Sequence, residues 1–262
     1  MLARELGADV RFVPPARGGD AVRLFWQTMR AQGAPVPHTS QMAQYAVFAA
    51  ARADGVKVML GGQGGDEAFM GYRKYFLFQL RHLIARRDWR GAPAMFGNIA
   101  EILPAIAGKA GLFWRERGRY RADAGAGLDS GLTLPPLDHS PSPGAGLGGD
   151  PAVRQALDVT RYSLPSLLRY EDRNSMGNSI ESRLPFLDHR VVAFGIGLPT
   201  RLKLSRGMGK YLLRQTMRGK VPDAILFNRD KRGFDTHHAA WIAEGIGASI
   251  RSAMHQHAQS VA

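Results

Sequence analysis

The chain has 262 residues, of which 45% are hydrophobic, and this is enough for one large core or two modest ones. It contains no cysteine, so disulfides, thiolate zinc sites and a thiol nucleophile are excluded, and a cytoplasmic location is the default expectation. The formal net charge of +13 is compatible with anionic partners, whereas no apolar run approaches the ~18 residues of a membrane helix.

The first part of the chain, residues 1–72, is predicted to contain alternating helices and strands. Residues 2–6 predict a short helix, and residues 10–13 predict a strand that Pro14 stops. A parallel sheet is built from strand and helix units in series. We therefore expect a chain that opens on a short helix to begin inside a domain.

Two longer helices are predicted at residues 21–30 and 41–53, each with apolar side chains at helical spacing. Residues 56–60 then predict a short buried strand, and residues 61–65 contain four glycines. Asp66 begins the next predicted helix. The order is therefore strand, glycine loop, helix.

The remainder of the chain is predicted to be mostly helical. Residues 73–121 carry eleven Lys/Arg and three acidic residues, a net charge of +8, which we interpret as the solvated face of a basic helical part. Residues 122–152 are rich in Gly, Pro, Ser and Asp and predict a flexible loop. Residues 153–262 predict a helical part. Its helices are expected near residues 153–168, 191–195, 210–217 and 239–254.

The glycine loop is the first candidate site. Gly62, Gly64 and Gly65 let the backbone pass close to a ligand, but the loop lacks both the Gly-Lys-Ser/Thr of a P-loop and the spacing of a dinucleotide fingerprint. A carboxylate at Asp66 suits a phosphate site if Mg²⁺ bridges the two groups. The alternative is a tight turn in which Asp66 caps the following helix.

A second polar cluster contains Asp172, Arg173, Glu181 and Arg183, ahead of a predicted core anchor at residues 184–187. Glu181 and Arg183 are two residues apart and would not face each other on a helix, so an irregular segment that lines a ligand is plausible. The alternative is an internal ion-pair network.

Two lysines follow in basic, glycine-containing segments. Lys210 comes directly after Gly-x-Gly at a predicted helix start, from which it can reach a phosphate. The helix dipole prefers acidic residues at that place, and this misfit favours a functional role. Lys231 begins a similar basic loop at residues 231–234.

Three blocks of this sequence resemble, in order, three blocks of the asparagine synthetases. Residues 60–67, with residues 71–72 behind them, are similar to L-S-G-E-G-x-D-E…G-G-Y. Residues 172–188 are similar to D-R-x-S-M…S…E-x-R-x-P-F-L-D, and residues 210–214 with 231–234 to K-x-x-L-R…K-x-G-F. β-Lactam synthetases and lasso-peptide cyclases share these blocks, so the resemblance indicates the chemistry better than the substrate.

The resemblance implies that residues 1–262 form a partial synthetase domain. Its fold would be α/β: a partial parallel-sheet nucleotide-binding domain of the PP-loop (adenine nucleotide alpha hydrolase-like) type, followed by a mostly helical remainder. In this family ATP and Mg²⁺ activate the side-chain carboxylate of aspartate as an acyl-adenylate, and ammonia then attacks the activated carbonyl.

The resemblance also implies roles for individual residues. Asp66 would hold Mg²⁺ with pyrophosphate, and Lys210 would offset the charge that develops on the leaving pyrophosphate. The remaining residues expected at the phosphates are Gly62, Gly64, Gly65 and Lys231. The residues expected to bind the acid substrate are Asp172, Arg173, Glu181 and Arg183.

This chain departs from the family pattern in three respects. Gln63 stands where the family has Glu, and it cannot replace that residue as a base. The family's S-G-G-x-D-S loop would precede Met1, and the glutaminase domain with its N-terminal cysteine is also missing from the sequence. The C-terminus at Ala262 comes early. We therefore expect a truncated product, or half of a split enzyme that has a separate glutaminase or N-terminal half as partner.

Two other functions are compatible with the sequence. A catalytically inactive remnant of the family would account for Gln63 and for the missing loop. A scaffold or binding protein would use the basic surface of residues 73–121, but that segment has no RNA-binding signature, so nucleic acid ranks last among the expected partners. No membrane partner is expected.

Overall fold

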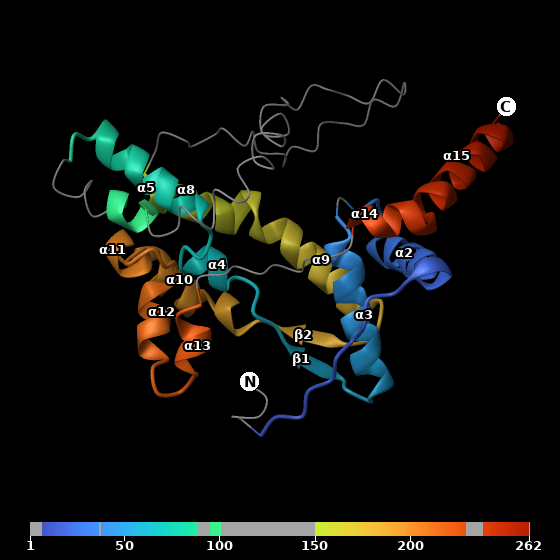
Figure 1. Ribbon diagram of the computed structural model, residues 1–262, viewed down its shortest axis with the longest axis horizontal. Helices are drawn as coiled ribbons and strands as arrows, with labels where there is room; N and C mark the ends of the chain where they lie inside the picture. The colour runs from blue at the N-terminus through green and yellow to red at the C-terminus, as the bar shows by residue number, and fades with distance from the viewer. Residues whose placement is uncertain (1–6, 37, 89–94, 101–149, 229–237, 262) are drawn as a thin grey trace. The chain divides into compact units, whose positions relative to one another are not determined.

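The computed structural model describes residues 7–36, 38–88, 95–100, 150–228 and 238–261 (Figure 1). The chain divides into two compact units. Unit 1 consists of Met1–Gly61, Leu167–Arg183 and Arg232–Ala262, and unit 2 of Gly62–Ser166 and Leu184–Lys231. Each unit combines segments that are far apart in the sequence. The division into four consecutive parts expected above stays a prediction.

Unit 1 is mainly helical. Its elements are α2 (Gly18–Gln32), α3 (Ser40–Ala53), β1 (Val58–Leu60), most of α9 (Leu164–Met176), β2 (Glu181–Arg183), α14 (His238–Trp241), the π-helical turn η3 (Ile242–Ile246) and α15 (Gly247–Val261). The helices predicted at residues 21–30 and 41–53 are confirmed, whereas the one predicted at residues 239–254 is helical on both sides of a kink at Gly245, which has φ 139°. α2 ends where Gly33 adopts φ 62° and its N–H reaches the last carbonyls of the helix, an arrangement that favours glycine.

The core of unit 1 lies where α2 meets α3 and the C-terminal helices. Buried apolar side chains from these elements form one cluster: Ala21, Leu24, Phe25, Met42, Trp241 and Ile246. Trp241 also donates its Nε1 hydrogen to the carbonyl of Ala16 at 2.7 Å. The apolar spacing recognised in the sequence therefore describes the buried faces of these helices.

The sheet of unit 1 consists of β1 and β2, which run parallel and side by side (Figure 1), with Val58 opposite Glu181 and Leu60 opposite Arg183. The strand predicted at residues 56–60 is therefore present but shorter. The prediction that it is buried was wrong, since Leu60 is 74% exposed and Val58 42%. A parallel strand is buried only where both faces of its sheet are covered, and the described part of the sheet has only these two strands.

The strand predicted at residues 10–13 was also wrong. These residues are irregular, and Phe12 is 86% exposed. Apolar alternation makes a strand only where a neighbouring strand can pair with it, and no described strand pairs with this segment. The guanidinium of Arg11 instead forms an ion pair with Asp54. The helix predicted at residues 2–6 lies outside the described residues.

Unit 2 is built from short helices. Its elements are α4 (Gly65–Ala68), α5 (Lys74–Ala85), a helical segment at residues 95–100, α8 (Pro151–Leu157), the π-helical turn η1 (Asp158–Tyr162), the 3₁₀ turn η2 (Pro185–Leu187), α10 (His189–Gly197), α11 (Thr200–Lys203), α12 (Tyr211–Thr216) and α13 (Asp223–Leu226). The helices predicted near residues 191–195 and 210–217 are confirmed. The fold as described is a mostly helical α/β structure with a small parallel sheet.

The continuous helix predicted at residues 153–168 is interrupted. α8 passes into η1, and Ser163 then separates η1 from α9, with its N–H bonded to the carbonyl of Asp158 at 3.1 Å. Pro165, near the start of α9, has no N–H with which to continue a helix from before. Pro165 in the sequence therefore predicts this break between η1 and α9.

The core of unit 2 collects aromatic and aliphatic residues of α5 and its neighbours. The buried members are Met70, Tyr75, Phe76, Phe78, Leu83, Met95 and Leu204.

In the part of the chain that the structure describes, no helix is both long and apolar enough to cross a membrane. The flexible loop predicted at residues 122–152 and the second half of the basic part lie almost wholly outside the described residues.

Candidate active site

The glycine loop follows β1 and leads into α4. Gly64 adopts φ 87° and precedes the first residue of α4. A Cβ at Gly64 would lie 2.1 Å from a methyl carbon of Leu187, and a Cβ at Gly65 would touch the ring of Phe186 at 3.4 Å. The positive φ and the close approach to η2 thus require glycine at position 64, whereas the contact at Gly65 is an ordinary van der Waals distance. A Cβ at Gly62 would meet nothing within 4 Å, so Gly62 is the glycine with open space beside it.

The contacts of Phe186 and Leu187 also test the expected core anchor. Both side chains are half-buried, and Phe186 packs edge-to-face on Phe69 with ring centroids 6.3 Å apart. The segment is therefore an anchor for the glycine loop and α4 within unit 2.

Asp66 and Lys210, the two residues expected at pyrophosphate, lie next to each other. The Lys210 Nζ is 2.9 Å from Asp66 Oδ1, and the two side chains are 28% and 30% exposed. Asp66 is the second residue of α4, and Gly64 occupies the cap position. The alternative role for Asp66 as a helix cap is therefore excluded. The sequence placed these residues 144 positions apart, and the fold joins them.

Two glycines make this approach possible. A Cβ at Gly71 would lie 1.8 Å from Asp66 Oδ1 and 2.5 Å from Lys210 Cε, so any side chain there would displace the pair. A Cβ at Gly209 would lie 2.5 Å from the carbonyl oxygen of Met70. The backbone of Lys210 itself donates to the carbonyl of Phe69 at 3.2 Å. The two segments therefore pack backbone against backbone.

The turn that carries Lys210 has an unusual conformation. Lys210 has φ 54° and Met70, in the facing segment, has φ 53°, although neither is glycine. Non-glycine residues in this region are held there by the surrounding structure, and such residues cluster at functional sites. Here the Arg214 Nε donates to the carbonyl of Gly209 at 2.9 Å, and Arg214 also donates to the carbonyl of Leu226. The hydrogen bonds of Arg214 therefore connect the turn to α13.

Glu67, the neighbour of Asp66, has a different environment. Its side chain is buried, and Oε1 accepts hydrogen bonds from the hydroxyl of Tyr72 at 2.5 Å and from that of Ser163 at 3.0 Å. Burial, and then the charge and hydrogen bond of Glu67, raise the pKa of Tyr72 far above its ordinary value. Glu67 thus fixes the segment that follows α4, and the sequence had not assigned it a role.

The residues expected to bind the acid substrate belong to unit 1. Asp172 and Arg173 are exposed on α9, and neither forms an ion pair with another described residue. Glu181 and Arg183 do pair, with Arg183 Nε 2.8 Å from Glu181 Oε1, and both are more than half exposed. They lie on β2, where residues two apart share a face. The alternative of an internal network is wrong for this pair, because it is a surface pair.

Unit 1 buries two polar neighbours of these candidates, Glu171 and Asn174. Glu171 accepts a hydrogen bond from the Ser182 hydroxyl at 2.7 Å, and the amide of Asn174 bonds to Gln32 and Gln44. A helical period gives the reason, since positions 171 and 174 share the inner face of α9 while positions 172 and 173 point outward. This was predictable from spacing once the segment was taken as a helix.

Two further candidates are Gln63 and Lys231, and only Gln63 belongs to the described residues. Gln63 is half-buried in the glycine loop and forms no hydrogen bond with another described residue. Lys231, with the whole of residues 231–234, lies outside the described residues. Among the described residues, no group of three or more His, Asp or Glu could hold a metal ion. A partly exposed carboxylate such as that of Asp66 suits a Mg²⁺ ion that phosphate oxygens also bind.

Comparison with known proteins gives a consistent result. The family model described as asparagine synthase matches residues 2–261. An asparagine synthetase homologue of Mycobacterium tuberculosis is 32% identical over 209 residues, which cover 72% of this chain and 31% of that protein. Asparagine synthetase (glutamine-hydrolyzing) 1 of Bacillus subtilis is 28% identical over 218 residues, covering 75% and 33%. Amidase chyE of Penicillium rubens is 28% identical over 276 residues, covering 91% and 41%. The chain spans about a third of the first two relatives.

Proposed function

Because the chain belongs to the asparagine synthase family, we propose that it performs the synthetase half of ATP-dependent amide formation. The carboxylate of an acid substrate, with aspartate as the expected one, attacks the α-phosphorus of ATP and releases pyrophosphate. Ammonia then attacks the carbonyl carbon of the acyl-adenylate, and AMP leaves. The observation that carries the proposal is the Asp66–Lys210 pair beside the glycine loop, at 2.9 Å.

The two members of the pair have complementary roles in this proposal. Asp66 would supply one carboxylate ligand to a Mg²⁺ ion, and that ion would offset negative charge on the phosphates. Lys210 then moves from Asp66 to the departing pyrophosphate and stabilises the negative charge that develops there. Their mutual contact keeps each charge paired before substrate binds, and their partial exposure leaves both accessible.

The other candidates complete the proposal. Gly62, the loop glycine with free space beside it, lets phosphate approach the backbone, and Lys231 adds positive charge. Asp172, Arg173, Glu181 and Arg183 bind the acid substrate. Ammonia comes from a separate glutaminase or from solution, and the protein works in the cytoplasm.

Pyrophosphate release by the purified 262-residue chain tests the proposal. With Mg²⁺-ATP, we expect release that depends on aspartate and continues on addition of ammonium. K210M is expected to lower the rate about 100-fold, because one charge-stabilising donor is lost. K220M is the matched control, since Lys220 is exposed and forms no ion pair with a described residue, and it should retain the rate. Equal rates in K210M and wild type would overturn the role of Lys210.

A second candidate function is supported by Gln63. Since an amide cannot take a proton from the attacking ammonia, a chain with Gln63 in the family's Glu position is also suited to be an inactive remnant. Titration of the folded chain with Mg²⁺-ATP separates the two: saturable binding supports the ligase, and its absence supports the remnant. In an active chain, Q63E should increase amide formation from ammonium while leaving pyrophosphate release little changed.

A basic surface that binds nucleic acid is a third candidate. It would show itself by DNA binding that weakens steeply as salt is raised, because phosphate contacts release counterions. If the DNA site and the ATP site are different, Mg²⁺-ATP should not compete with DNA for binding to the chain.

A further inference from the structure

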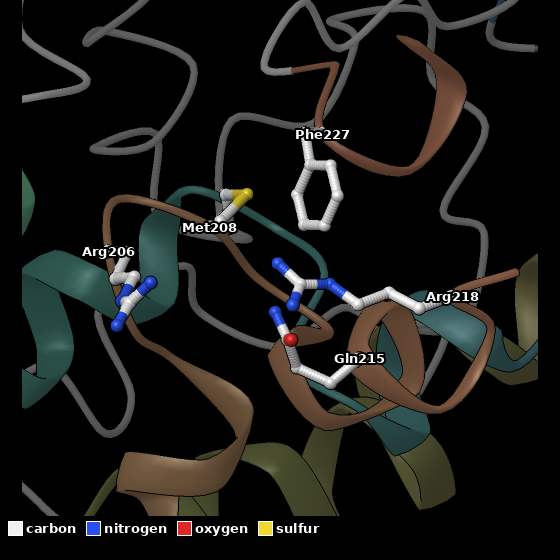
Figure 2. A pocket seen from close by; sticks show the side chains of 5 residues that line it. All are labelled: Arg206, Met208, Gln215, Arg218 and Phe227. Atoms are coloured by element: carbon white, nitrogen blue, oxygen red, sulfur yellow. The ribbon is translucent and has the colours of Figure 1, made fainter. Parts of the chain in front are cut away.

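A pocket of about 270 Å³ lies in unit 2 and is separate in its lining from the Asp66–Lys210 pair. Figure 2 shows its walls: Arg206, Met208, Gln215, Arg218 and Phe227. Arg206 and Met208 come from the turn before α12, Gln215 from α12, and Phe227 from the end of α13. Arg218 follows the end of α12, so segments close together in the sequence line this open pocket.

The charge of the pocket is positive. Neither Arg206 nor Arg218 forms an ion pair with a described residue, and no residue of the lining is acidic. Residues 184–228, which supply the whole lining, carry eight Lys/Arg and two Asp/Glu. The Arg218 guanidinium lies over the ring of Phe227 at 5.0 Å from its centroid, so its N–H groups are held near the ring by an attraction that does not neutralise them.

The turn that presents Arg206 is strained in a way that points to a role for this side chain. Ser205 and Met208 exchange two backbone hydrogen bonds, at 3.1 Å and 2.9 Å, across a two-residue turn. Arg206 and Gly207 occupy it with φ 51° and 67°, the geometry of a type I′ turn. Asn, Asp or Gly is preferred where Arg206 stands. An arginine kept at a conformationally costly position beside a pocket is the kind of outlier from which function is inferred.

The turn is also fixed from outside. The N–H of Gly207 donates to Asn98 Oδ1 at 2.9 Å, and Met208 is buried. The backbone of the turn that carries Arg206 is therefore held by contacts within unit 2.

We propose that this pocket binds a small organic anion that carries a flat apolar group. The guanidinium groups of Arg206 and Arg218 bind its carboxylate or phosphate oxygens, for which the planar fork of arginine is well suited. The apolar group packs against the ring of Phe227 and the adaptable thioether of Met208. The pocket volume of about 270 Å³ lies just below the usual range for small-ligand pockets, so the anion must be small. Neither Asp66 nor Lys210 takes part, so the site is additional to the proposed ligase site.

Calorimetric titration of the full chain with phenyl phosphate tests this proposal, because the probe combines both features. We expect saturable binding, with at least about tenfold weaker binding of inorganic phosphate and of phenol, which each carry one feature. R206N is the decisive variant, since asparagine adopts positive φ readily and keeps the turn while it removes the guanidinium. R206N and R218Q should each weaken binding about tenfold. R201Q, an exposed arginine of α11 outside the lining, should bind as wild type does.

Three results would overturn the proposal: no saturable binding of phenyl phosphate, equal weakening in R201Q and R206N, or binding lost in K210M but kept in R206N. The last result would place the anion at the ligase site. K210M is expected to lose pyrophosphate release and to keep phenyl phosphate binding. Failure of the ligase proposal and failure of this one are therefore distinguishable.

Discussion

Unit 1 and unit 2 bury different kinds of polar group. In unit 1 the buried polar side chains are mostly amides and hydroxyls: Thr28, Gln32, Thr39, Gln41, Asn174 and Ser175, with Glu171 as the charged member. In unit 2 they are mostly charged: Glu67, Arg154, Asp158 and Lys203. Burying a charge costs far more than burying an amide unless partners surround it. Unit 2 therefore depends on complete pairing of its buried charges, and its free energy of unfolding should respond to pH.

The largest expected effect comes from Asp158. This buried carboxylate accepts the Tyr75 hydroxyl at 2.7 Å and pairs with Lys74 at 2.7 Å and Arg154 at 3.2 Å. D158N removes the carboxylate that pairs with the buried Arg154 and should lower the free energy of unfolding by ~3–5 kcal/mol, measured by urea titration. The control is D20N in unit 1, whose pair with Arg23 is exposed and should cost less than ~0.5 kcal/mol. Similar losses in both variants would remove the contrast between the units.

Lys203 is the group whose titration should make the free energy of unfolding depend on pH. Its Nζ is buried and donates to Gln155 Oε1 at 2.6 Å and to the carbonyls of Gly195 and Ile196. Burial lowers the pKa of Lys203 to about 8. From about pH 8 up to the ordinary lysine pKa the unfolded chain binds more protons than the folded one, so the free energy of unfolding rises with pH.

The window for this measurement is limited by the tyrosines. Burial raises the pKa of Tyr72 and of Tyr75, and this acts in the opposite sense above about pH 10. Between about pH 7.5 and about pH 9.5 we expect a rise of ~2 kcal/mol in the wild type. K203M should be less stable at the lower pH and should lack this rise. A rise of the same size in K203M would assign it to another group.

In unit 1, N174A tests the amide network. The Asn174 amide accepts from Gln32 at 2.8 Å and donates to the Gln41 carbonyl and to Gln44, each at 3.0 Å. Its loss leaves buried groups unpaired and should cost ~2 kcal/mol, with little change across the same pH range. Q27A, at an exposed position of α2, is the control and should cost less than ~0.5 kcal/mol. If the loss of stability in N174A depended strongly on pH, the proposed difference between the neutral polar groups of unit 1 and the charged groups of unit 2 would be contradicted.

G71A is expected to change the stability of the fold least among these variants, but it should lower activity. The added Cβ would occupy the place of the Asp66 carboxylate and push Lys210 aside, so pyrophosphate release should fall about tenfold, equivalent to ~1.4 kcal/mol. G197A is the matched control, because a Cβ at Gly197 meets nothing within 4 Å. Unchanged release in G71A would show that the pair is not required in its observed geometry.

Much of the local structure followed from the sequence alone. The apolar spacing of α2, α3 and α10 predicted their extents to within a few residues, because a buried helical face imposes its own period. The order of β1, glycine loop and α4, and the three ordered blocks that identify the family, were also readable. Gly71 belonged to one of these blocks, yet nothing in the sequence showed that it makes room for Asp66 and Lys210.

The tertiary structure decided what the local pattern could not. Residues 10–13 and 56–60 had strand-like sequences, but pairing and burial depend on neighbouring strands, and a strand sequence does not specify its partner. Glu181 and Arg183 pair because they lie on a strand, whereas a helix would have separated them. Asp66 meets Lys210 only because two glycines allow two backbones to touch. Local sequence thus determined which elements form, and packing between distant segments determined which charges meet.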